Sequence, residues 1–186
     1  MSTSQAIMWF RRDLRLHDNP AWVAAARYDQ VYPIYIDDTH IPSAHQAGQA
    51  TKVWRHHSLQ SLNHDLDHCL SIYCGDAFAI LQHLVTTHQI HAVSFNQPHT
   101  PWETDRDQKI IAWLRAQSIE VHTFNGALLW DPQTILKPDS TPYKVFTPFY
   151  RKGCLSAPAP RCPLERPNVK PHRLSDAQSI EDLKLL

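Results

Sequence analysis

The sequence alternates short apolar segments with longer segments of helical character, and this order limits the folds open to the chain more than any other feature. The apolar segments are rich in β-branched and aromatic residues, as strands are, and occupy residues 6–10, 31–36, 71–74, 92–96 and 120–124. Helical patterns fall between them, near residues 20–28, 50–69, 76–88 and 102–117. Strands joined through helices form right-handed βαβ crossovers and a parallel sheet covered on both faces. We predict a Rossmann-like three-layer α/β/α sandwich whose five parallel strands have the order 3-2-1-4-5.

A charged loop follows the first predicted strand and precedes the first predicted helix. Asp18 or Asn19 is suited to accept the first helical N–H groups, and Pro20 then occupies the first helical position, where its missing N–H costs nothing. In an open α/β sheet, ligands bind where the strands end and the following helices begin. The charges expected at this functional edge are Arg11, Arg12, Asp13 and Arg15.

Several common uses of such a fold lack their sequence motifs here. The loop after the first strand contains no glycine, so the G-x-G-x-x-G turn that lets the backbone approach a dinucleotide is absent. The chain has neither G-x-x-x-x-G-K-[ST] nor a G-x-S-x-G nucleophile elbow. These absences argue against NAD binding, ATP hydrolysis and serine hydrolysis by the usual routes.

The charge balance argues against tight DNA binding by this chain alone. Eighteen basic and eighteen acidic residues give a net charge of zero, whereas phosphate neutralisation normally requires a basic excess. The sequence shows neither a membrane-spanning apolar run nor a secretory signal, and its four cysteines lack the spacing of zinc ligands or of a disulfide framework. We expect a cytoplasmic protein with reduced cysteines and no membrane association.

The predicted helix at residues 50–69 carries four histidines. The helical period places His57, His64 and His68 on one stripe and three leucines on the opposite stripe. We therefore expect the histidines of this helix, His56 included, on its solvent side. His64 and His68 are four residues apart, as two ligands of a transition metal can be, but no carboxylate or cysteine completes the set. We predict no metal site.

After Gly126 the sequence becomes rich in proline, which argues against long regular elements. We expect residues 1–126 to form the α/β core. Residues 127–155 carry large apolar side chains and are expected to pack on that core as a closing segment. Residues 156–186 are interpreted as a proline-rich interdomain linker in which a helix begins at Ser175.

Two motifs resemble those of the DNA photolyase/cryptochrome family. Residues 9–19 read Trp-Phe-Arg-Arg-Asp-Leu-Arg-Leu-His-Asp-Asn, which is similar to the family's opening motif, and residues 142–149 read Pro-Tyr-Lys-Val-Phe-Thr-Pro-Phe. They occur in the family's order. The resemblance covers essentially the whole chain but only the first part of the family's length, the N-terminal α/β domain.

The resemblance implies a site for a light-harvesting antenna chromophore: methenyltetrahydrofolate, a deazaflavin or flavin mononucleotide (FMN). In folate-binding members an acidic residue at the position of Glu103 contacts the pterin, while Trp102 replaces the family's asparagine. The loop after the first strand and the end of the second flank the deazaflavin pocket in other members. The implied binding residues are Arg11, Arg12, Asp13, Ile36, Asp37, Asp38, Trp102 and Glu103.

The residues themselves leave two other interpretations open. Glu103 also suits the first turn of a helix capped by Thr100, where a carboxylate favours the helix dipole. Arg12, Asp13 and Arg15 also suit a salt-bridge brace that holds the loop.

In the family the catalytic flavin adenine dinucleotide (FAD), the lesion pocket and the electron-transfer tryptophans belong to a helical domain beyond the linker. The resemblance therefore implies the antenna domain of a deoxyribodipyrimidine photolyase, an enzyme of light-dependent DNA repair, and one that is not competent for repair alone. Its expected partner is the missing or separately encoded helical domain, docked through Arg15, Tyr143, Phe146 and Phe149. The alternatives are a free-standing pigment- or nucleotide-binding sensor module and an inert remnant of a truncated gene.

Overall fold

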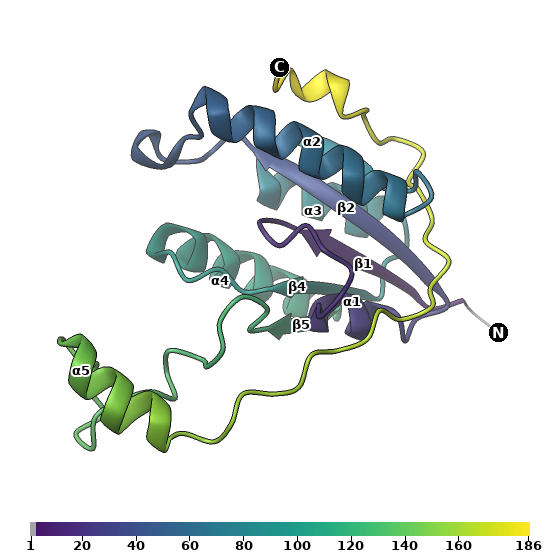
Figure 1. Cartoon of the computed structure of the whole chain (residues 1–186). Helices are drawn as coiled ribbons and strands as arrows, with labels where there is room; N and C mark the ends of the chain where they lie inside the picture. Colours follow the sequence, from purple (N-terminus) through teal and green to yellow (C-terminus); the bar gives the residue numbers. More distant parts are fainter. Residues whose placement is uncertain (1–2) are drawn as a thin grey trace.

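A computed structural model describes residues 3–186 and shows a parallel sheet between two layers of helices (Figure 1). The strands of this sheet are β1 (Gln5–Phe10), β2 (Gln30–Asp38), β3 (Ser71–Gly75), β4 (Ala92–Asn96) and β5 (Glu120–Phe124). All four neighbouring pairs are parallel, and the order is β3-β2-β1-β4-β5. The predicted fold class and strand order are confirmed.

The helices connect the strands in the predicted alternation. They are α1 (Pro20–Ala25), α2 (Gln49–Asp65), α3 (Ala77–Thr87), α4 (Pro101–Ala116) and the short α5 (Phe146–Pro148). Asn19, rather than Asp18, caps α1, because its side chain accepts a hydrogen bond from the N–H of Trp22 at 3.2 Å. Asp76 caps α3 in the same way, accepting from the N–H of Phe78 at 2.9 Å.

Each face of the sheet has its own hydrophobic core. Helices α1 and α2 cover one face, where Phe10 of β1 packs near Trp22. Helices α3 and α4 cover the other, where Trp9 meets Phe95 edge-on at 5.4 Å between ring centroids. Trp9 and Phe10 are both buried because successive side chains of a strand point to opposite faces. Trp9 and Phe10 therefore both belong to the core, one on each face of the sheet.

Helix α2 differs from its prediction in two respects. It ends at Asp65 instead of residue 69, because Asp67 and His68 take left-handed backbone angles that break the helical pattern. His56 is buried (7% exposed) and so contradicts the expectation that every histidine of this helix faces solvent. His57, His64 and His68 are exposed, as predicted.

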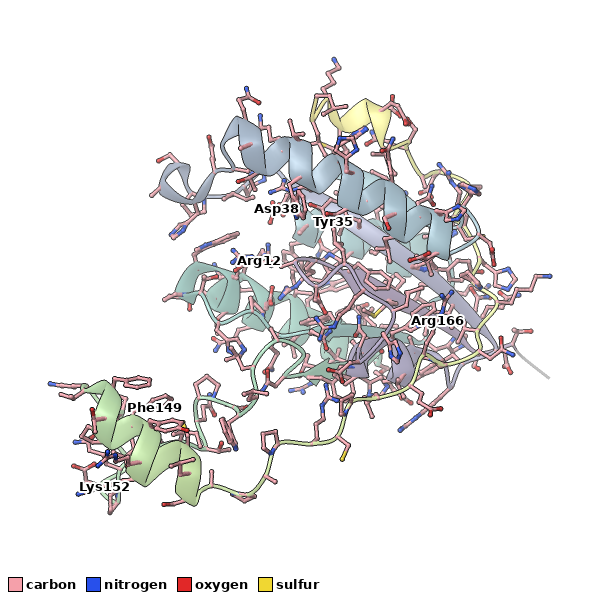
Figure 2. All side chains as sticks on the ribbon, in the orientation of Figure 1. Arg12, Tyr35, Asp38, Phe149, Lys152 and Arg166 are labelled. Atoms are coloured by element: carbon pink, nitrogen blue, oxygen red, sulfur yellow. The ribbon has the colours of Figure 1, made fainter. Side chains whose placement is uncertain are left out.

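Residues 164–186 form a C-terminal strap along the core instead of the free linker and helix expected there (Figure 1). The N–H groups of His172 and Gln178 donate to carbonyls of β2 and β3, each at 2.9 Å. Arg166 donates to the carbonyl of Asp65 at the end of α2 at 2.6 Å (Figure 2). The apolar side chains of the strap are buried in the two cores: Leu174, Ile180, Leu183 and Leu185. Burying these side chains fixes the strap without a helix, and only the 3₁₀ turn Glu181–Leu183 is helical.

Residues 127–155 form an arm that extends away from the sheet and ends in α5 and the helical turns after it (Figure 1). The arm packs on itself: Gly153 sits against Ile135 and Tyr143, where a Cβ would clash with the Ile135 side chain. Phe146 is 72% exposed and stacks on Tyr150. The expectation that this segment closes over the core is therefore wrong for its aromatic half. None of the helices within residues 3–186 combines the length and apolar character needed to span a membrane.

Candidate functional site

A cavity of about 650 Å³ lies at the carboxyl ends of β1 and β2, between the first turns of α2 and α4. Arg12, Tyr35 and Asp38, which line it, lie near one another in Figure 2. This is the edge at which open α/β folds bind ligands, because loops and helix N-termini meet there around a concave surface. The cavity draws its walls from both faces of the sheet, since α2 and α4 cover opposite faces.

Seven of the eight side chains predicted at the site share this cavity. They are Arg11, Arg12, Ile36, Asp37, Asp38, Trp102 and Glu103. Asp13 does not line it and instead accepts a short hydrogen bond from the amide of Asn96. Burial raises the pKa of Asp13, with the Asn96 contact acting in the opposite direction.

Arg15 braces the loop after β1. Its guanidinium donates to the carbonyl of His17 at 3.2 Å, of Asp18 at 3.0 Å and of Gly126 at 2.5 Å. These bonds tie the loop to the turn after β5, so Arg15 braces the loop through backbone carbonyls and not through a salt bridge. A docking role for this partly exposed side chain stays a prediction.

Glu103 is a buried carboxylate at the start of α4, 6% exposed. It forms an ion pair with Arg12 at 2.9 Å and accepts a short hydrogen bond from the hydroxyl of Thr100. Thr100 stands at the helix cap, but its hydroxyl makes no cap hydrogen bond to the backbone. The Arg12 side chain is 67% exposed, so Glu103 is held by a partner that solvent or a ligand can reach.

Four charged side chains form the floor behind the cavity. Arg11 pairs with Asp107 at 2.6 Å, and Arg106 bridges Asp107 at 2.9 Å and Asp38 at 2.8 Å. Burial lowers the pKa of Arg11 and raises that of Asp107. Burial also disfavours the charged form of Arg106. The carboxylates of Asp107 and Asp38 outweigh this effect and raise the pKa of Arg106. The network therefore fixes α4 relative to the ends of β1 and β2.

Aromatic rings stack on these guanidinium groups. Arg11 lies 4.6 Å from the Trp9 ring centroid, and Arg106 lies 5.3 Å from Trp9 and 5.2 Å from Trp102. His45 also lies near the Trp102 ring, at 5.9 Å between centroids. The indole N–H of Trp102 is buried and has no hydrogen-bond partner within residues 3–186. A flat apolar wall with an unpaired donor suits an aromatic heterocycle that carries acceptor atoms.

Sequence reasoning missed four important lining residues: His45, Trp54, Arg55 and Arg106. Trp54 and Arg55 lie on α2, and their position near its N-terminus was a usable signal, because helix starts face the ligand edge of such folds. Arg55 pairs with Asp37 at 2.7 Å. His45 belongs to the 3₁₀ turn Ser43–His45, where no periodic pattern indicates orientation.

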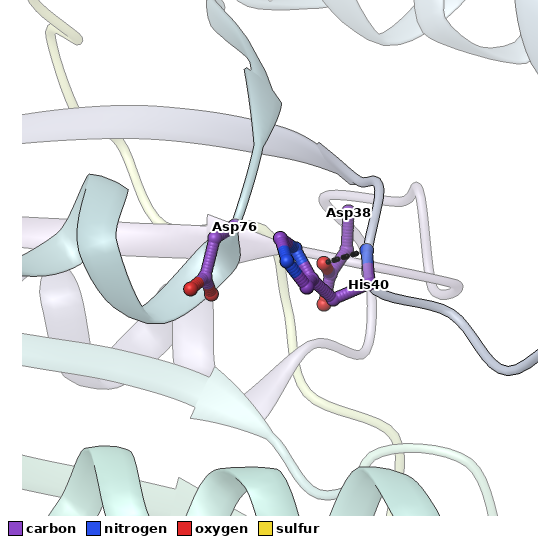
Figure 3. A group of neighbouring side chains, drawn as sticks. All are labelled: Asp38, His40 and Asp76. Atoms are coloured by element: carbon purple, nitrogen blue, oxygen red, sulfur yellow. Dashed lines mark hydrogen bonds between the residues drawn. The ribbon is translucent and has the colours of Figure 1, made fainter.

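Asp38, His40 and Asp76 bring three metal-ligating atoms within 4.8 Å of one another (Figure 3). Both carboxylates already accept hydrogen bonds from other groups of the protein. Asp38 binds Arg106 and the His40 N–H, while Asp76 caps α3. A guanidinium and the positive end of a helix dipole both disfavour a bound cation. The cluster is therefore poorly suited to a metal ion.

Comparison with known proteins agrees with the fold. A sequence model described as DNA photolyase matches residues 6–168. The deoxyribodipyrimidine photo-lyase of Agrobacterium fabrum is 32% identical to this chain, and the match covers all of this chain and 39% of the relative. Cryptochrome-1 of Arabidopsis thaliana is also 32% identical, and that match covers 87% of this chain and 24% of the relative.

Solved structures show the same relationship. The class III photolyase of Agrobacterium tumefaciens superposes with a TM-score of 0.88 at 31% identity, over 100% of this chain and 39% of its own. The archaeal photolyase of Sulfolobus tokodaii, at 24% identity, shares the fold with a TM-score of 0.82 over 97% of this chain and 41% of its own. This chain thus spans about two fifths of the photolyases that it matches. The chain belongs to the DNA photolyase family and corresponds to the N-terminal α/β domain of its members.

Proposed function

We propose that this chain is the antenna domain of a deoxyribodipyrimidine photolyase and that it binds a light-harvesting chromophore in the cavity at the ends of β1 and β2. The observation that carries this proposal is the cavity itself. It combines indole walls with arginine and carboxylate groups at the ligand edge of the fold. The bound chromophore would supply absorption of light and transfer of the excitation energy to a flavin.

The residues present fit a flat heterocycle. Trp102 provides an apolar surface and a buried N–H without a partner, and Glu103 provides a carboxylate acceptor for ring N–H groups. Arg12 lies at the exposed side of Glu103, where it can pair with an anionic substituent of the ligand. Methenyltetrahydrofolate, a deazaflavin and FMN all have a flat ring system suited to these groups.

The proposal includes dependence on a second, helical domain for repair. The chain spans 39% of the Agrobacterium photolyase, and its zero net charge provides no basic excess for holding DNA. The exposed arm offers a surface for that domain, with Phe146 72% and Phe149 37% exposed and Tyr143 in contact with Phe149. Exposed aromatic side chains of this size favour burial in an interface.

A repair assay tests the functional assignment. The purified chain is illuminated with blue light in the presence of free FAD and DNA that contains pyrimidine dimers. We expect no repair by the chain alone, and repair when the FAD-containing helical part of a photolyase is added. Repair by the chain alone would contradict the proposal. Chromophore binding without association with a helical part would instead indicate a free-standing pigment-binding module.

A further inference from the structure

Trp54 is the tryptophan whose environment the fold does not explain. Its side chain lies on α2, lines the cavity and is 77% exposed, whereas Trp9 and Trp22 are each 2% exposed. An indole has a large apolar surface and is on average highly buried in folded proteins. Leaving Trp54 in water therefore opposes stability, and the side chain gains most when another flat apolar group covers it.

One side of helix α2 lines the cavity and does not pack in the core. Thr51, Trp54, Arg55 and Ser58 all line the cavity, and their spacing of three, four and seven residues places them on one side of the helix. The packing stripe of the same helix carries Leu59 and Leu62, which are buried against the sheet. The orientation of Trp54 is thus set by the core packing of α2, which turns the indole toward the cavity.

On the opposite wall of the cavity, the aromatic ring of Trp102 already has stacking partners. Trp102 of α4 has both the His45 ring and the Arg106 guanidinium against its indole. Within residues 3–186, by contrast, no aromatic ring or guanidinium stacks on Trp54. Of the two tryptophans that line the cavity from α4 and α2, Trp102 therefore has stacking partners among residues 3–186, whereas Trp54 has a free ring face there.

We infer that Trp54 is a ligand-binding residue that stacks on the flat ring of the bound heterocycle and covers it from the α2 side. This inference rests on the proposed function, because it assigns a residue to the same cavity. It also narrows the ligand class, since a free indole face suits stacking on a planar aromatic ring.

Two variants and a matched control test the role of Trp54. The full chain is titrated separately with methenyltetrahydrofolate, a deazaflavin and FMN, and both the dissociation constant and the visible spectrum of the bound pigment are recorded. For the pigment that the chain binds, Trp54→Ala should weaken binding about tenfold and reverse the spectral change caused by stacking. Trp54→Phe should restore most of the affinity. Val53→Ala alters the adjacent residue of α2, which does not line the cavity, and should bind as the unchanged chain does.

The outcomes separate the two proposals. Trp54 is exposed, so its replacement should leave the melting temperature of the chain unchanged, and lost binding then reports on the ligand contact. If the chain binds a pigment and Trp54→Ala binds it with equal affinity and an equal spectrum, the role of Trp54 is refuted and the antenna proposal stands. If the unchanged chain binds none of the three pigments, both proposals fail.

Discussion

Arg11 and Asp107 form an ion pair at 2.6 Å whose side chains are only 8% and 6% exposed, and this pair joins the loop after β1 to helix α4. The two residues are 96 positions apart in the sequence, so the contact exists only in the folded chain. Arg106 binds the same carboxylate and extends the network to Asp38 at the end of β2. The floor of the cavity therefore depends on one aspartate.

Replacing Asp107 by alanine should be strongly destabilising. The change leaves Arg11 buried without its carboxylate, and breaking a buried pair in this way costs about 3–5 kcal/mol of unfolding free energy. Asp105→Ala is the matched control, because Asp105 is exposed on the same helix and should change stability by less than about 0.5 kcal/mol. Urea denaturation followed by tryptophan fluorescence measures both. Equal midpoints for the two variants would mean that the ion pair does not hold the cavity floor.

Gly126 should not tolerate a side chain. A Cβ at this position would overlap the amide group of Asn96, which itself bonds to Asn19 and Asp13. Gly126→Ala should lower the unfolding free energy by about 1–3 kcal/mol, as overpacking of a fixed site does. At Gly48 a Cβ would meet no atom within 4 Å, so Gly48→Ala should have little effect. Thermal melts compare the two variants, and similar loss in both would refute a specific clash at Asn96.

The C-terminal strap should be weakened by acid through Asp176. Partial burial alone would raise its pKa, but hydrogen bonds from Tyr73 and His83, together with the His88 ring at 3.4 Å, outweigh burial and lower the pKa of Asp176 below 3.8. The folded chain therefore releases this proton more readily than the unfolded chain. The resulting stabilisation is present above pH 3.8 and is lost as the pH falls through the folded-state pKa.

Comparing the unchanged chain with Asp176→Asn isolates this effect. The unchanged chain should have the higher urea midpoint at pH 5, and the difference should shrink toward pH 3. Hydrogen exchange of the strap amides, such as that of Gln178, should show the same trend. A difference that is independent of pH would contradict a role for the ionised carboxylate.

Replacement of Glu103 should discriminate among the proposed chromophores. If the cavity holds methenyltetrahydrofolate, Glu103→Gln should weaken its binding by about 1.5–3 kcal/mol, because one hydrogen bond to a charged acceptor is lost. Asp105→Asn, an exposed change on the same helix, should leave the affinity unchanged. Isothermal titration calorimetry measures both. Unaltered folate affinity in Glu103→Gln would assign the carboxylate to its contacts with Arg12 and Thr100 alone.

The sequence predicted the sheet because its signals are local and periodic. The strands at residues 92–96 and 120–124 have the predicted bounds, and the strand order follows from the regular alternation of strand and helix. The ligand edge was predicted for the same reason, since Arg11, Asp38 and Glu103 each stand where a strand ends or a helix begins.

The remaining contacts depend on pairings between distant segments. The strap is proline-rich and lacks a helical or strand period, so nothing local indicated that Leu174 would be buried in the core on the side of α3 and α4. The arm has many apolar side chains, and for that reason we expected it to pack on the core. In the structure it packs on itself instead, and Gly153 and Tyr143 of the arm cover its Ile135. Trp54 was missed because it lies outside the packing stripe of α2, where periodicity gives no information about ligands.

The most direct test of the account is retention of a chromophore by the chain. The purified protein is incubated separately with methenyltetrahydrofolate, FMN and a deazaflavin, passed through a desalting column and examined by visible absorption. We predict that one of these pigments remains bound in a one-to-one ratio, with a spectrum shifted from that of the free pigment. Complete loss of all three on the column, from protein that remains folded by circular dichroism, would contradict the assignment of this cavity as an antenna site.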